Sequence, residues 1–83
     1  MDIADSAYKH GVVDEDIDHA IAHAEVTKVL RPGDPLVFIT IGPDRGDELL
    51  ELIWFEFEDR DLLVHAMGLR RKFRHLLPKG HRR

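Results

Sequence analysis

The sequence predicts an α+β fold in which helices pack on one small antiparallel sheet, in the order α-α-β-β-β-α. Apolar residues recur at helical spacing in the first third of the chain, and three short runs rich in β-branched and aromatic residues follow. An apolar stripe at helical spacing returns near the end. Because short turns separate the three runs, the strands should form a three-stranded antiparallel β-meander, which buries one face against the helices.

Two helices are expected at the N-terminal end. Asp5 or Ser6 could cap a short first helix that ends at Gly11, and Asp14 could cap a second helix over about 14–25. The second helix would carry acidic residues in its first turn, where they suit the helix dipole. Its apolar positions are Val13, Ile17, Ala20, Ile21 and Ala24.

Strands are expected at 36–41, 49–57 and 62–66, each bounded by residues that favour turns. The middle strand is apolar on both faces, so we place it centrally in the sheet. The chain should close with a C-terminal helix over about 69–77, ended by Pro78. Its apolar stripe consists of Leu69, Phe73, Leu76 and Leu77.

Length and composition predict one domain without disulfides. The 83 residues leave no room for a second domain, so we expect a single domain over 1–83 with a flexible basic tail over 78–83. The absence of cysteine excludes a disulfide scaffold, a thiolate metal site and cysteine catalysis. No apolar run reaches the roughly 20 residues of a membrane span, and the acidic start does not resemble a signal peptide. We therefore expect a soluble, cytoplasmic protein without a membrane partner.

Charge is distributed unevenly along the chain. The formal net charge is −4, but residues 1–59 hold 15 acidic and 4 basic side chains, whereas residues 60–83 hold 1 acidic and 8 basic ones. The last quarter could therefore bind the phosphates of a nucleic acid. Alternatively, the two parts of the chain could neutralise each other in the fold.

Several short motifs, taken in order, resemble a known family. They are Tyr8-Lys9-His10-Gly11-Val12, Ile41-Gly42, Leu49-Leu50-Glu51-Leu52, Val64-His65-Ala66-Met67 and Arg70-Arg71-Lys72. In this order they resemble the BrnT-type toxins and, more broadly, the RelE/ParE-like superfamily of type II toxin–antitoxin systems. The resemblance spans about residues 5–77 and implies a RelE-like domain.

The resemblance also implies an activity and partners. Such a toxin would be an endoribonuclease that cleaves RNA, free or on the ribosome, without a metal or other cofactor, and a cognate antitoxin would inhibit it. In this reaction the ribose 2′-OH attacks the adjacent phosphate. The site therefore needs a base, an acid for the leaving 5′ oxygen, and cations around the phosphate.

The candidate cations lie mainly in the C-terminal segment. They are Arg70, Arg71, Lys72 and Arg74, with Arg45 in a hairpin turn as a further candidate for RNA binding. Arginine suits phosphate because its guanidinium donates to two oxygens at once. Three of these cations would occupy the first turn of the last helix, where the dipole disfavours positive charge, so a bound phosphate would account for them.

The catalytic candidates are His65, Glu51 and Arg70. An unperturbed histidine titrates near neutral pH, which suits His65 for proton transfer, although it could equally be a histidine held on a sheet face. Glu51 would place a carboxylate on a largely apolar strand face, where it needs a partner. It could act as a base, but we favour an ion pair with an arginine of the final helix. Lys9 and His10 are interpreted as mainly structural, with the alternative that one of them lines the site.

Other hypotheses remain open. His19 and His23 have the spacing of a helical metal pair but lack a third ligand, so no metal site is expected. The chain could be a non-catalytic RelE-like module that binds an acidic partner protein or a nucleic acid through its basic C-terminal helix. It could also be a homodimer formed through an exposed sheet edge.

Overall fold

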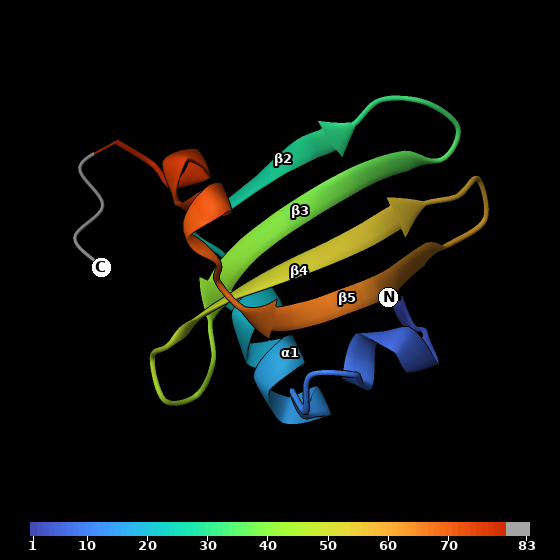
Figure 1. Cartoon of the computed structure of the whole chain (residues 1–83). Coiled ribbons are helices and arrows are strands. Elements are labelled where there is room, and N and C mark those ends of the chain that lie inside the picture. The colour runs from blue at the N-terminus through green and yellow to red at the C-terminus, as the bar shows by residue number, and fades with distance from the viewer. Residues whose placement is uncertain (80–83) are drawn as a thin grey trace.

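The computed structural model describes residues 1–79, and Figure 1 shows one sheet with short helical segments around it. The strands are β1 (Asp2–Ile3), β2 (Val26–Arg31), β3 (Leu36–Pro43), β4 (Leu49–Glu56) and β5 (Asp61–Gly68). The helical segments are the 3-10 turn η1 (Asp5–Tyr8), the helix α1 (Asp14–Ala22) and the 3-10 segment η2 (Arg71–Leu76). The strand order is β1-β5-β4-β3-β2, with β1–β5 parallel and the other pairs antiparallel.

The predicted layout of two N-terminal helices, three strands and a C-terminal helix is wrong. The described residues form a five-stranded mixed sheet with one α-helix and two 3-10 segments. The three predicted strands are present as β3, β4 and β5, and β4 is central as expected. Strand β2 extends them on one side, and β1 pairs with β5 on the other. Of the tail predicted over 78–83, residues 80–83 lie outside the described part of the chain.

Both mispredicted helices fail for local reasons. The segment before Gly11 holds only the four residues of η1, too few to nucleate an α-helix, and Gly11 leaves helical geometry with φ of 79°. At the other end, Arg71 and Lys72 place positive charge in the first turn of η2, which has no acidic residue and no side-chain cap. The hydrogen bond from the N–H of Phe73 to the carbonyl of Arg70 is of the 3-10 type.

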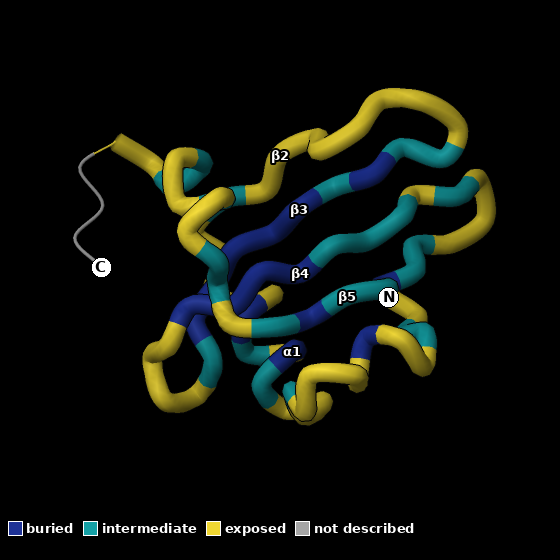
Figure 2. The backbone as a smooth tube through the Cα atoms, viewed as in Figure 1, coloured by how far each residue is buried: buried dark blue, intermediate teal, exposed yellow. Residues whose placement is uncertain are grey.

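Strand β2 was not predicted because its sequence lacks a buried face. Five of its six residues are exposed, so its apolar residues do not alternate with polar ones in the way of a half-buried strand. Figure 2 shows this exposed edge beside the buried positions of β3 and β4. The strand is held by its ladder with β3 and by a 2.8 Å hydrogen bond between the hydroxyls of Thr27 and Thr40.

One face of the sheet is closed by α1 and η1. The buried side chains of this core are Ala7, Ile17, Ala20, Leu50, Leu52, Leu63 and Ala66. Helix α1 approaches β3 so closely at Gly42 that a Cβ there would lie 2.1 Å from the carbonyl oxygen of Ala20. Only glycine allows this contact, which fixes the helix on the sheet.

The opposite face is covered at one end only, by η2 and the residues beside it. Leu69, Phe73, Leu76 and Leu77 pack there against Ile39, Ile41 and Leu49. Figure 1 shows η2 beside the start of β2, away from α1 and η1. The rest of this face carries Glu51 and His65, with Arg70 against them.

Candidate functional site

A buried carboxylate lies at the centre of the half-covered face. Glu51 is the third residue of β4, and none of its surface is exposed. Its Oε1 accepts a 2.8 Å hydrogen bond from the backbone N–H of Arg70, and its Oε2 accepts bonds of 2.9 and 2.6 Å from Nε and Nη2 of the same residue. Nε2 of His65 also lies 2.9 Å from Oε2. The structure thus joins the three predicted catalytic residues in one cluster, and the favoured ion pair between Glu51 and an arginine is confirmed.

A β-bulge in β5 places His65 against Glu51. Leu63 pairs with Trp54, and His65 pairs with the next residue back, Ile53, so Val64 is the extra residue. With regular alternation Leu63 and His65 would share a face, but the bulge leaves Leu63 in the core under η1 and turns His65 to the opposite face. The bulge therefore creates the contact between His65 and Glu51.

The chain after β5 brings Arg70 to the same carboxylate. The N–H of Leu69 donates to the carbonyl of Leu49 at 2.9 Å, which holds the chain beside β4. Arg70 is extended, with φ −84° and ψ 151°, so that both its backbone N–H and its guanidinium meet Glu51. The predicted helix-dipole site for phosphate does not exist here, because η2 is a short 3-10 segment and this N–H is already used by Glu51.

Glu51 is the anion of the cluster. Burial alone would raise the pKa of Glu51, but hydrogen bonds from the side chain and backbone of Arg70 and from His65 outweigh it and leave that pKa below its ordinary value. The same contact raises the pKa of Arg70. An ionised carboxylate only accepts hydrogen bonds, so Nε2 of His65 must be the protonated ring nitrogen. In the neutral imidazole Nδ1 is then the basic nitrogen.

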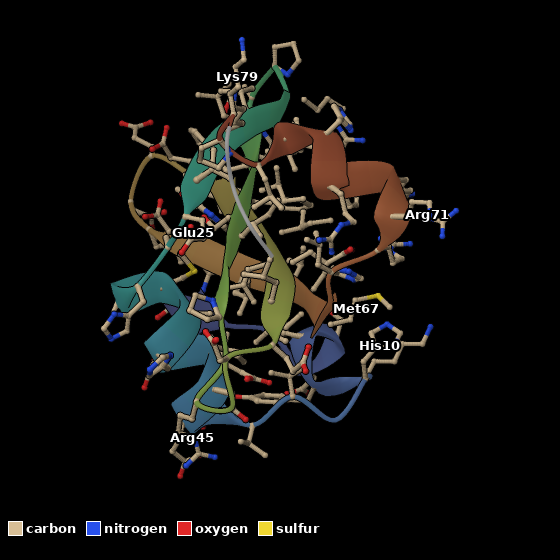
Figure 3. All side chains as sticks on the ribbon, turned by 90° about the vertical axis from the view of Figure 1, so that its left-hand side faces the viewer. His10, Glu25, Arg45, Met67, Arg71 and Lys79 are labelled. Atoms are coloured by element: carbon tan, nitrogen blue, oxygen red, sulfur yellow. The ribbon has the colours of Figure 1, made fainter. Side chains whose placement is uncertain are left out.

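A second histidine adjoins the cluster from the N-terminal part of the chain. The ring of His10 contacts that of His65 edge to face, with centroids 5.6 Å apart and planes at 73°. Figure 3 shows His10 on the same side of the molecule as Met67 and Arg71. The sequence interpretation treated His10 as mainly structural. Its position two residues after Tyr8, in a motif that precedes a glycine turn, gave no sign of the contact with β5.

An open groove runs over the sheet beside His65 and Arg70. Its volume is about 420 Å³. The apolar residues that line it are Leu30, Val37, Ile53, Phe55 and Val64. Arg31 of β2 joins His65 and Arg70 as a polar lining residue. Arg31 was not among the candidate cations, because it lies outside the basic C-terminal segment.

The predicted cations separate into two groups. Arg71 and Lys72 directly follow Arg70 and are exposed. The Phe73 ring lies between two cations: its centroid is 5.0 Å from the Lys72 ammonium and 5.4 Å from the Arg70 guanidinium. Arg74 instead lines a separate hollow together with Asp44 and Glu48.

Arg45 is not part of the cluster. Its backbone N–H and Nε donate to Asp16 Oδ1 at 3.0 and 2.8 Å. This contact lowers the pKa of Asp16 and raises that of Arg45. Figure 3 shows Arg45 at the opposite end of the view from Arg71. The structure therefore does not bring Arg45 together with the other candidate phosphate ligands.

Two further findings concern metals and membranes. Within residues 1–79 no three histidine, aspartate or glutamate side chains are placed to hold a metal ion, and Nδ1 of His19 donates to the carbonyl of Pro43 at 2.9 Å. In the same part of the chain, no helix has the length and apolar character needed to cross a bilayer.

Comparison of the chain with protein-family models, with curated proteins and with solved structures found no match.

Proposed function

We propose that this protein is an endoribonuclease toxin of the BrnT or RelE/ParE-like type, held inactive by an antitoxin, in which His65 transfers the proton during RNA cleavage. The observation that carries the proposal is the pairing of His65 with the fully buried Glu51 at the edge of an open, cation-lined groove. A histidine oriented by a buried carboxylate, with its other nitrogen basic, is suited to general base catalysis.

In the proposed reaction Nδ1 of His65 accepts the proton of the ribose 2′-OH. The 2′ oxygen forms a bond to phosphorus, and the bond from phosphorus to the 5′ oxygen breaks. The products are a 2′,3′-cyclic phosphate and a 5′-hydroxyl end. Arg70, Arg71 and Lys72 stabilise the charge that develops on the phosphate. Glu51 is buried and does not reach substrate, so it acts as a positioning residue that fixes the tautomer of His65.

The groove suits single-stranded RNA. Its apolar floor offers a surface for an unstacked base, and the cations at its rim are placed for the backbone. A larger hollow of about 530 Å³ beside the turns that follow β2 and β4 is lined by Asp34, Glu56, Glu58 and Asp61 and by one cation, Arg60, and this acidic excess would repel phosphate. Charge thus favours the His65 end of the molecule for RNA.

The test is cleavage of a short single-stranded RNA by the purified chain in the presence of a chelator. We expect the wild type to release a 2′,3′-cyclic phosphate and to leave the DNA analogue intact, because DNA has no 2′-OH. His65→Ala should lower the rate by about 10²–10⁴-fold while it still binds RNA.

Two cation variants sharpen this test. Arg71→Ala/Lys72→Ala should weaken RNA binding and flatten its salt dependence, since two phosphate contacts are lost and the Glu51 cluster is kept. Arg60→Ala is the matched control, because it removes a cation that pairs with Asp2 at the far end of the sheet. Salt-dependent binding without any cleavage by the wild type would reject the enzyme and favour the non-catalytic binding module.

A further inference from the structure

The segment that carries His10 is fastened to the same bulge that orients His65. The N–H of Ala4 donates to the carbonyl of Leu63 at 2.9 Å, and the hydroxyl of Ser6 donates to the carbonyl of Val64 at 2.7 Å. Ala7 of the same turn is fully buried in the core. The position of η1 is therefore set by β5 at the two residues directly before His65.

The chain between η1 and α1 then directs His10 towards His65. The N–H of Gly11 bonds to the carbonyl of Tyr8 at 3.0 Å, and Gly11 takes a φ of 79° that favours glycine. The Tyr8 hydroxyl donates to Asp14 at the start of α1, which closes the loop. His10 lies on this loop with its ring against that of His65, and the residue is exposed to solvent.

The two histidines differ in their partners. His65 faces the buried carboxylate of Glu51, which stabilises the imidazolium formed when His65 accepts a proton. His10 forms no ion pair with a carboxylate in the part of the chain that the structure describes, and its side chain is exposed beside His65. The other cations of this part of the chain are arginine and lysine, residue types that seldom serve as general acids near neutral pH.

From this asymmetry we infer that His10 is the general acid of the reaction, the catalytic residue that protonates the leaving 5′ oxygen. The inference rests on the proposed function and completes it, because cleavage needs an acid as well as a base. The 2′-OH proton passes to Nδ1 of His65, and the electron pair of the broken P–O5′ bond takes the proton of the His10 imidazolium. Both histidines return to their starting states by exchange with solvent.

The decisive experiment compares two RNA substrates that differ in one atom. In one substrate the leaving 5′ oxygen is replaced by sulfur, which departs as a thiolate and needs little help from an acid, because a thiol has a pKa of about 8.5. In the other the linkage is normal. The cleavage rate of each is measured for the wild type, His10→Ala, His65→Ala and the control His23→Ala, which removes an exposed imidazole at the end of α1.

We expect His10→Ala to slow cleavage of the normal RNA by about 10²-fold or more and to cleave the sulfur-substituted RNA at a rate close to that of the wild type. His65→Ala should lose activity on both substrates, and His23→Ala on neither. His10→Gln, which keeps a polar side chain without a titratable proton, should behave as His10→Ala does and guards against an effect of lost packing.

Other outcomes separate the two proposals. If His10→Ala cleaves the normal RNA as fast as the wild type, or slows both substrates equally, His10 is not the acid, although the enzyme proposal stands. If the wild type cleaves neither substrate, the proposed function fails, and the role of His10 fails with it.

Discussion

Two of the arginine–carboxylate pairs among residues 1–79 share a backbone and an Nε donor but lie in different surroundings. In each, one arginine gives both its backbone N–H and its Nε to a single carboxylate: Arg70 to Glu51, and Arg45 to Asp16. The Glu51 side chain is 0% exposed, whereas that of Asp16 is 23% exposed and its arginine is 56% exposed. Burial is therefore the main difference between the two pairs.

Only the carboxylate of the Glu51 pair is fully buried, since the Arg70 side chain is 40% exposed, and burial makes Glu51 more dependent on its arginine than Asp16 is. If its arginine is lost, the carboxylate of Glu51 stays in the core without its counter-ion, while Asp16 can be hydrated instead. The buried pair also has a third member, His65, which the exposed pair lacks. We infer that the first pair determines the geometry of a site and that the second only fastens a hairpin turn to α1.

The largest effect expected from this comparison is on stability. Arg70→Ala should lower the free energy of unfolding by about 3–5 kcal/mol, because it leaves a buried charge without its partner. Arg45→Ala should leave the unfolding midpoint close to that of the wild type. Urea denaturation followed by Trp54 fluorescence measures both. Equal losses in the two variants would show that burial does not distinguish the pairs.

The sequence predicted the members of the buried pair better than the fold around them. A carboxylate on an otherwise apolar strand requires a partner, so an ion pair between Glu51 and an arginine of the expected last helix could be predicted. The structure shows that this arginine is Arg70, which lies before η2. His65 was chosen for its chemistry, but the direction of its side chain depends on the bulge at Val64, and no residue of β5 indicates a bulge there. The contact between His10 and His65 was not predicted, because the two residues are distant in sequence.

The fold was mispredicted where the sequence pattern does not distinguish one kind of element from another. The stripe of Leu69, Phe73 and Leu76 fits an α-helix and a 3-10 segment alike, because both place residues three or four apart on one side. Strand β2 could not be predicted from alternation, because it is a mostly exposed edge strand that depends on its ladder with β3. The composition of a central strand is enough to predict it, whereas edge strands and short helical segments also depend on contacts with the rest of the fold.

A second, smaller effect is expected on the pH dependence of stability. The pKa of Glu51 is lowered by folding, so the folded chain binds fewer protons here than the unfolded chain in acid. The stability that this group contributes is complete above the ordinary glutamate pKa and is lost as the pH falls through the lowered one. As the pH falls below the ordinary glutamate pKa, the wild type should therefore lose stability more steeply than Glu51→Gln.

The exposed pair supplies the control for this measurement. The pKa of Asp16 is also lowered, by its hydrogen bonds to Arg45, so Asp16→Asn shifts the curve in the same direction. The shift should be smaller, because water and salt screen an exposed pair. Thermal unfolding at a series of pH values and two salt concentrations measures both variants. A curve for Glu51→Gln that is parallel to that of the wild type would contradict the assignment of Glu51 as a buried anion.

The smallest expected effect is on the position of His65, which contacts Glu51 beside Arg70. Ser6→Ala removes the hydroxyl that donates to the carbonyl of the bulge residue Val64, at a cost of about 0.5–1.5 kcal/mol. The Arg45–Asp16 pair has no contact with the bulge, so this substitution should affect only the surroundings of Glu51. If the hydrogen bond helps to keep His65 turned towards Glu51, Ser6→Ala should change the imidazole resonances of His65 in NMR spectra and leave those of His19 and His23 in place. Unchanged His65 resonances in a destabilised variant would mean that the bulge is fixed by the sheet ladder alone.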